Sequence, residues 1–170
     1  MNDLLNAPAL DPKFLTPFVQ GVLETFQIQC QMNVTAGEPQ INVTESLAKI
    51  DLAAVAGLVG MKVNGIVALC FSTPMFLETM SQMLGQKEDK LTLMLESGAA
   101  ELLNVCFGKA KRLLNMRGYG LEKTIPFVMR GENLVLSHHS GAPVVTLPFT
   151  TQFGPFYMQL VVEIVESKSF

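Results

Sequence analysis

The chain has 170 residues, of which 49% are hydrophobic and only 16% are charged, and its formal net charge at pH 7 is −3. This balance excludes a disordered chain, which needs few hydrophobic residues and many charges. The lack of excess positive charge argues against nucleic acid as a partner. The length suits one domain, so we expect residues 1–170 to form a single domain. The large apolar fraction predicts one of three features, namely an unusually large core, a membrane span or a surface buried against a second copy.

The chain begins with two helix-start signals. Asp11-Pro12 and Thr16-Pro17 each place a capping oxygen before a proline at the first helical position. Apolar residues then recur at helical spacing as far as Phe26. We therefore predict a first helix that ends at about Phe26.

Residues 27–35 give the clearest strand pattern in the chain. Four apolar side chains alternate strictly with polar ones in this segment, namely Ile28, Cys30, Met32 and Val34. Strict alternation is typical of a strand with one apolar and one polar face. A turn and a second alternating run around residues 41–43 follow, so we predict two strands in this region.

Residues 52–71 form an apolar run long enough to cross a membrane. Lys62 lies at its centre, where a charge would cost about 2.5–3.5 kcal/mol on insertion. Asn64-Gly65 beside it is the favoured two-residue turn of a hairpin. We therefore predict two strands joined at Asn64-Gly65, and no membrane contact.

The second half of the chain contains two helical patterns and then returns to period two. One helix is predicted from Thr73 to Gly85, and a longer one from Leu91 to Met116. Four strands are predicted after them, over 125–129, 134–136, 144–149 and 156–165. This order of elements lacks βαβ alternation and predicts an α+β fold with a mostly antiparallel sheet and long helices packed on it.

The two halves of the chain also resemble each other loosely. Each offers a helix and then strands that end in a hairpin, and Thr16–Phe26 aligns without a gap on Ser97–Phe107. We therefore expect loosely duplicated half-domains.

The three cysteines indicate the compartment. Cys30, Cys70 and Cys106 lie in apolar segments without CxxC spacing, and the first residues lack the features of a signal peptide. We expect free, buried thiols and a cytoplasmic location.

The adjacent His138 and His139 would point to opposite faces of a strand, so we expect an exposed turn there and no metal site.

The longest predicted helix places a polar row opposite its apolar face. At about 100° per residue, Ser97, Glu101 and Asn104 gather on one side, and Gly108 and Lys111 continue it. The opposite, core-facing side holds Leu95, Ala99, Leu102, Leu103, Cys106, Ala110, Leu113 and Leu114. An amide beside a carboxylate can orient a water while the carboxylate holds a cation. The outer face of a helix needs no function, so the row by itself leaves the function open.

The residues around this row resemble the CheX/CheC-type chemotaxis phosphatases. The family motif is Asp or Ser, three residues, Glu, two residues and Asn, with a Pro further along the chain. Here the sequence is Ser97-Gly-Ala-Ala-Glu101-Leu-Leu-Asn104, with twenty-one residues between Asn104 and Pro126. The distance to Pro126 is one residue shorter than in the family motif, and the difference falls in a glycine-rich turn, where loops absorb length changes.

This resemblance implies an enzyme that hydrolyses the aspartyl phosphate of a phosphorylated receiver domain, the CheY-like response regulator. Asn104 would orient the attacking water, Glu101 would bind the receiver's lysine, and Ser97, Gly108 and Lys111 would contact the partner. The Mg²⁺ of the reaction would belong to the receiver, and the chain would bind no cofactor of its own. Such an enzyme needs no nucleophile, because the receiver supplies the electrophile and most of the charge stabilisation.

The resemblance also implies one site per chain. In the alignment of the two halves, the first helix offers Thr16, Gln20 and Leu23 where a second motif would need Ser or Asp, Glu and Asn. Leucine cannot orient a water, so the first helix carries no second site, as in the CheX-like branch of the family. The resemblance to that branch also implies a homodimer joined through the sheet. The alternative function is a non-catalytic, CheX-like dimeric binding or scaffold module in two-component signalling.

Overall fold

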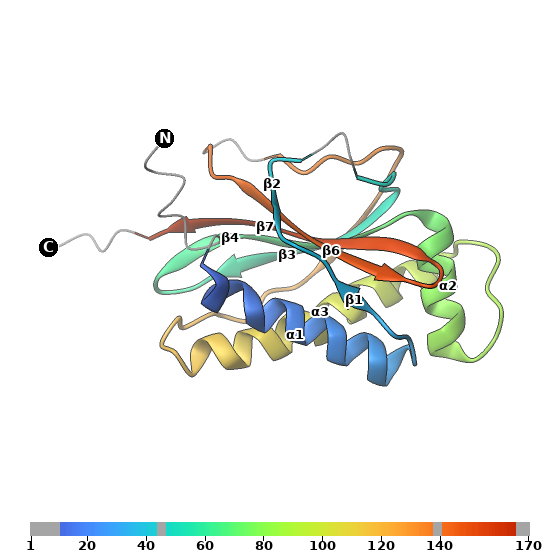
Figure 1. Ribbon diagram of the computed structural model, residues 1–170, viewed down its shortest axis with the longest axis horizontal. Helices are drawn as coiled ribbons and strands as arrows, with labels where there is room; N and C mark the ends of the chain where they lie inside the picture. The colour runs from blue at the N-terminus through green and yellow to red at the C-terminus, as the bar shows by residue number, and fades with distance from the viewer. Residues whose placement is uncertain (1–10, 44–46, 138–140, 166–170) are drawn as a thin grey trace, which may run out of the picture.

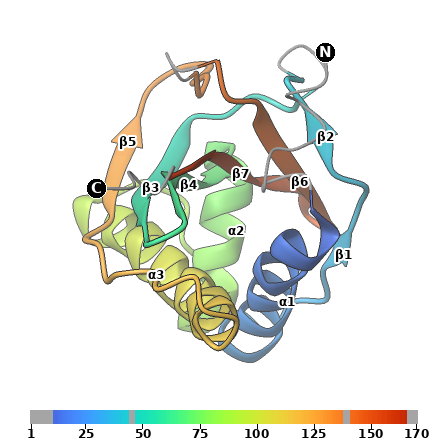
Figure 2. The same cartoon turned by 90° about the vertical axis from the view of Figure 1, so that its left-hand side faces the viewer.

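The computed structural model describes residues 11–43, 47–137 and 141–165. Its seven strands form one antiparallel sheet, and all three helices lie on the same side of that sheet (Figures 1 and 2). The predicted α+β class, the antiparallel sheet and the helices packed on it are therefore confirmed.

Two hairpins form the centre of the sheet. The strands are β1 (Thr35–Ala36), β2 (Gln40–Ile41), β3 (Leu52–Val59), β4 (Val63–Phe71), β5 (Phe127–Arg130), β6 (Val144–Thr151) and β7 (Gly154–Ile164). Their order is β1-β6-β7-β4-β3-β5, and β2 also pairs with β6. The β3–β4 hairpin of the first half thus meets the β6–β7 hairpin of the second half through β4 and β7. This is the arrangement that two loosely duplicated half-domains would produce.

The helices begin and end at recognisable caps. They are α1 (Pro12–Gln29), α2 (Thr73–Leu84) and α3 (Leu93–Asn115). Asp11 caps α1, so the helix starts at the first of the two predicted signals. Ser72 caps α2, which begins at Thr73, and Gly85 ends it with a φ of 68°, a left-handed conformation that favours glycine.

The predicted strand over residues 27–35 is wrong. Helix α1 continues to Gln29, and the N–H groups of Cys30 and Met32 both donate to the carbonyl of Phe26. Gln31, with a φ of 52°, then turns the chain, and only Thr35–Ala36 forms a strand. The alternation misled because Cys30 and Met32 are buried at the end of the helix rather than on one face of a sheet.

The predicted hairpin over residues 52–71 is confirmed, but its turn is not at Asn64-Gly65. Asn64 pairs with Val59 and Gly65 with Leu58, so the chain reverses over residues 60–62. Gly65 lies inside β4, where a Cβ atom would come within 1.8 Å of the Val161 carbonyl oxygen on β7. Glycine is therefore required there by the close approach of two strands, not by a turn.

The segment 134–136 also differs from its predicted strand. Leu134 and Leu136 form no strand and instead pack on the helix-free face of the sheet, in a small cluster around Tyr157. The hydroxyl of Tyr157 connects this cluster to the segment before β3, because it accepts a hydrogen bond of 2.8 Å from the N–H of Ala48.

Helix α3 packs closely on α1 as well as on the sheet. A Cβ atom on Gly21 of α1 would lie 2.4 Å from the carbonyl oxygen of Cys106 on α3, so the two backbones nearly touch. The rings of Phe18 and Phe107 stack across the same contact, with centroids 6.1 Å apart. Within the described residues, no helix is long and apolar enough to cross a membrane.

Candidate functional site

Helix α3 is anchored along its whole length by its buried face. Thr92 caps its start by accepting a hydrogen bond of 3.2 Å from the N–H of Leu95. The buried side chains are Leu95, Ala99, Leu102, Leu103, Cys106, Phe107, Ala110 and Leu114. This is the predicted core side with Phe107 added, while Leu113 is only half-buried. The opposite face is consequently held in a fixed orientation.

The predicted polar row lies on that opposite face. Ser97, Glu101 and Asn104 are all exposed on α3. Glu101 and Asn104 are three residues apart, which places their Cβ atoms about 5–6 Å from each other. The structure therefore brings the carboxylate and the amide side by side, as the spacing predicted.

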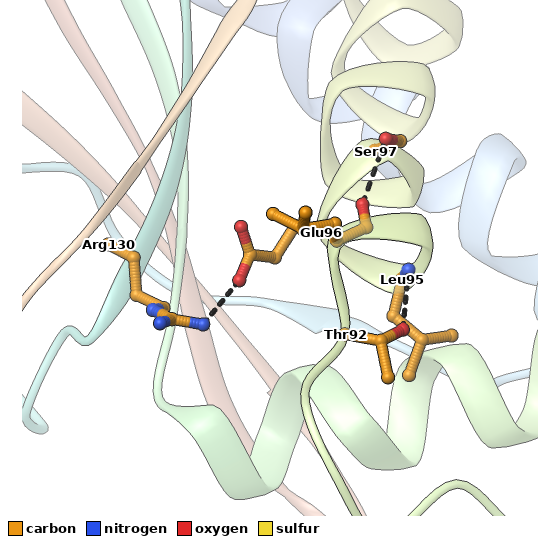
Figure 3. A network of polar contacts seen from close by, with 6 residues as sticks. Thr92, Leu95, Glu96, Ser97 and Arg130 are labelled. Atoms are coloured by element: carbon orange, nitrogen blue, oxygen red, sulfur yellow. Dashed lines mark hydrogen bonds and ion pairs between the residues drawn. The ribbon is translucent and has the colours of Figure 1, made fainter.

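The members of the row differ in whether their polar groups are already used. Ser97 Oγ donates a hydrogen bond of 3.0 Å to the carbonyl of Leu93, so its hydroxyl is directed along the helix (Figure 3). Glu101 and Asn104 make no hydrogen bond or ion pair with any residue that the structure describes. Their polar groups are available to a partner.

A second glutamate on α3 serves a different purpose. Glu96 reaches toward β5 and pairs with the guanidinium of Arg130 (Figure 3). This pair ties the first turns of α3 to β5, the edge strand of the sheet. Pro126, which is half-buried, directly precedes β5. No local sequence pattern predicts this pair, because its members lie 34 residues apart.

Gly108 and Lys111 continue the row toward the end of α3, and both are half-buried. A Cβ atom on Gly108 would meet nothing within 4 Å, so the surface there is open. Lys111 Nζ lies 3.3 Å from the carbonyl oxygen of Glu122 and 5.1 Å from the ring centroid of Phe107. Burial, and secondarily the charge of Lys123, lowers the pKa of Lys111 below its usual value.

The corresponding face of α1 does not repeat the arrangement. Thr16 and Gln20 are exposed, but Leu23 is half-buried and packs against the core. Thr16 Oγ1 donates to the carbonyl of Pro12 at 2.7 Å. The aligned positions of α1 thus carry the amide of Gln20 but no carboxylate, and Leu23 stands where the motif needs Asn.

Other candidate sites are weaker. Among the described ranges, no group of three or more His, Cys, Asp or Glu side chains could hold a metal ion, and the predicted histidine turn at His138 and His139 lies outside those ranges. A cavity of about 650 Å³ lies on the helix-free side of the sheet, lined in part by Leu47, Leu134 and Gln159. It is on the other side of the sheet from the polar row.

The sequence matches the family model of the chemotaxis phosphatase CheX over residues 52–150, which is more than half of the chain and includes the polar row. No curated protein matches the sequence.

Solved structures of chemotaxis proteins share the fold. A CheC-like superfamily protein from Shewanella sp. PV-4 has 28% sequence identity and a TM-score of 0.83, with 91% of this chain and 99% of that chain covered. A chemotactic CheC-like protein from Shewanella oneidensis has 30% identity and a TM-score of 0.79, with 89% and 98% covered. The CheX–CheY–beryllofluoride–Mg²⁺ complex from Borrelia burgdorferi, at 18% identity and a TM-score of 0.73, shares the fold over 88% of this chain and 97% of that chain.

Proposed function

The chain belongs to the chemotaxis phosphatase CheX family, and from this premise we propose that it hydrolyses the aspartyl phosphate of a CheY-like receiver domain. The observation that carries the proposal is the state of two neighbouring side chains on α3. Glu101 and Asn104 are exposed, lie next to each other on a helix fixed by α1 and the sheet, and have no partner among the described residues.

Asn104 is suited to orient the attacking water. Its amide oxygen accepts a hydrogen bond from the water, which aligns the water oxygen in line with the bond between phosphorus and the aspartyl oxygen. As the new P–O bond forms, the aspartyl oxygen leaves as a carboxylate, and the protons of the water stay on the released inorganic phosphate. A carboxamide has no titratable proton, so Asn104 acts by positioning and not as a base.

Glu101 is suited to hold the receiver in register. Its carboxylate is placed to accept a charge-assisted hydrogen bond from the receiver's lysine, about one helical turn away from the water. Ser97, Gly108 and Lys111 lie along the same line on α3 and would contact the receiver on either side of this pair. The Mg²⁺ of the reaction enters as part of the substrate, because carboxylates and a phosphoryl group are the ligands that Mg²⁺ prefers.

Phosphate release from phosphorylated receivers tests this function. Receiver domains from the same cell are phosphorylated with a small phosphodonor, and inorganic phosphate is followed with and without the protein. We expect faster release from at least one receiver. If none is accelerated while one still binds the protein, the non-catalytic scaffold module is the correct function instead.

The homodimer and the cytoplasmic location are part of the same proposal. Strand β5 ends the sheet and exposes apolar side chains, with Phe127 55% and Met129 45% accessible. An exposed apolar edge supports a dimer joined through the sheet. The free, buried thiols support a reducing compartment. A monomer at micromolar concentration in analytical ultracentrifugation would refute the dimer.

A further inference from the structure

Positive charge gathers where α3 ends, although the chain as a whole is negative. The N-terminus of α1 and the C-terminus of α3 lie at the same end of the molecule (Figure 1). We call the cations found there the basic end, which comprises Lys13, Lys62, Lys109, Lys111, Arg112, Arg117 and Lys123. Contacts place three of these residues at this end: the Arg117 guanidinium donates to the carbonyl of Lys13, and Lys62 Nζ lies 5.6 Å from the ring centroid of Tyr119, shortly after α3.

Only part of this charge is used within the fold. Lys109 Nζ pairs with Glu24 at 3.1 Å, Lys111 binds the carbonyl of Glu122, and the carboxylate of Asp11 caps α1 nearby. The side chains of Arg112 and Lys123 are exposed and make no hydrogen bond or ion pair with the described residues. The helix dipole accounts for one of them, Arg112 in the last turn of α3.

The basic end is close enough to the polar row to belong to the same interface. Arg112 follows Asn104 by eight residues, about 12 Å along the axis of α3 and about 80° around it. A standard interface buries about 800 Å² on each partner, which is a disc of about 16 Å radius. A protein bound over Asn104 would therefore cover Arg112. Lys123 lies close to Lys111, which continues the polar row on α3.

The chemistry of the proposed substrate fits this surface. A phosphoaspartyl group and the carboxylates that hold Mg²⁺ make the active face of a phosphorylated receiver acidic. We infer that the basic end binds the acidic face of the phosphorylated receiver and speeds its approach to Asn104. This inference rests on the proposed function and adds the residues that bring the two proteins together. Opposite potentials of this kind raise the association rate and are weakened by salt.

The test compares two pairs of charge-removing substitutions. The first pair is Arg112→Gln with Lys123→Gln. The matched control is Lys87→Gln with Lys90→Gln, which removes the same charge from two exposed lysines that lie outside the basic end and make no hydrogen bond or ion pair with the described residues. The dissociation constant for receiver domains of the same cell, loaded with beryllofluoride and Mg²⁺, is measured from about 0.05 M to about 0.5 M salt. At low salt the first pair should bind about five- to twenty-fold more weakly than the wild type, and the difference should vanish at high salt.

The control pair should stay within about two-fold of the wild type at every salt concentration. Equal affinities for the wild type and the first pair, or equal losses in both pairs, would overturn the inference. It is also overturned if no loaded receiver binds. A DNA duplex is the second probe, and the inference is overturned if only the duplex binds and the first pair of substitutions weakens that binding. The proposed function is judged separately by phosphate release from the wild type, so a failure of this inference can be distinguished from a failure of the proposed function.

Discussion

Asn104 and Asn115 lie on the same face of α3, eleven residues and about 20° apart, yet only Asn115 is used by the fold. Asn115 Nδ2 donates to the carbonyl of Leu121 at 3.0 Å, and its Oδ1 accepts from the N–H of the same residue at 2.6 Å. Asn104 makes no such contact with the described residues. One asparagine closes the turn after the helix, and the other is left for a partner.

Asn115→Ala should lower the stability of the protein. The substitution removes both hydrogen bonds to Leu121, so we expect the free energy of unfolding to fall by about 1–2 kcal/mol. Asn104→Ala is the matched control and should stay within about 0.5 kcal/mol of the wild type. Urea denaturation followed by circular dichroism measures both, and equal stabilities would show that the contacts of Asn115 contribute nothing.

Glu101→Gln should weaken the binding of a receiver. It replaces a charge-assisted hydrogen bond with a neutral one about half as strong, a loss of about 1–1.5 kcal/mol, so affinity for a beryllofluoride-loaded receiver should fall about 5- to 13-fold. Glu96→Gln is the control, because Glu96 faces Arg130 and not the polar row. Isothermal titration calorimetry separates the two, and an unchanged affinity in Glu101→Gln would refute the role proposed for Glu101.

Gly21→Ala should destabilise the packing of α1 on α3. The new methyl group would lie 2.4 Å from the carbonyl oxygen of Cys106, inside the contact distance of the two helices. Overpacking of this kind costs about 1–3 kcal/mol, which thermal unfolding would detect. A variant as stable as the wild type would show that α3 is less firmly held than we argue.

Gly108→Ala should have the opposite effect on stability. The added methyl group meets nothing within 4 Å, and alanine favours a helix over glycine by about 0.5–1 kcal/mol. Because Gly108 is proposed to contact the receiver, the same variant should bind it more weakly. A stabilised variant with unchanged affinity would remove Gly108 from the proposed interface.

The three buried thiols predict a loss of stability at alkaline pH. Burial raises the pKa of Cys30, Cys70 and Cys106 to about 12 in the folded protein, against about 8.5 in an unfolded chain. The unfolded state therefore releases these protons first, so their contribution to stability is complete below about pH 8.5 and is lost as the pH rises toward 12. Chemical denaturation at pH 8 and pH 10 measures this loss, and an equally steep loss in Cys70→Ala would contradict it for Cys70.

Helix α3 could be predicted in detail because everything that defines it is local. Thr92 caps the helix, the apolar residues repeat at helical spacing, and the polar row follows from the same periodicity. The relation of Glu101 to Asn104 depends only on three residues of helix, so the sequence was sufficient to place them together.

Long-range contacts explain where the predictions failed. The sequence at Asn64-Gly65 is a favoured turn, but Gly65 lies against the carbonyl of Val161, a contact that no local pattern contains. Cys30 and Met32 alternate like a strand, yet the end of α1 buries both. The sequence shows four cations of the basic end close together near the end of α3, namely Lys109, Lys111, Arg112 and Arg117. Lys13 joins them only through the packing of α1 beside α3, which no local pattern contains.

Phosphate release by Asn104→Ala tests the central claim most directly. The measurement uses a receiver whose dephosphorylation the wild type accelerates, at saturating receiver concentration, with Asn115→Ala as the control that removes an asparagine from the same helix. Loss of a group that positions the reacting water should lower the catalysed rate at least about 100-fold, while Asn115→Ala retains activity at a temperature where it is folded. Full activity in Asn104→Ala would contradict the proposed role of Asn104 in catalysis.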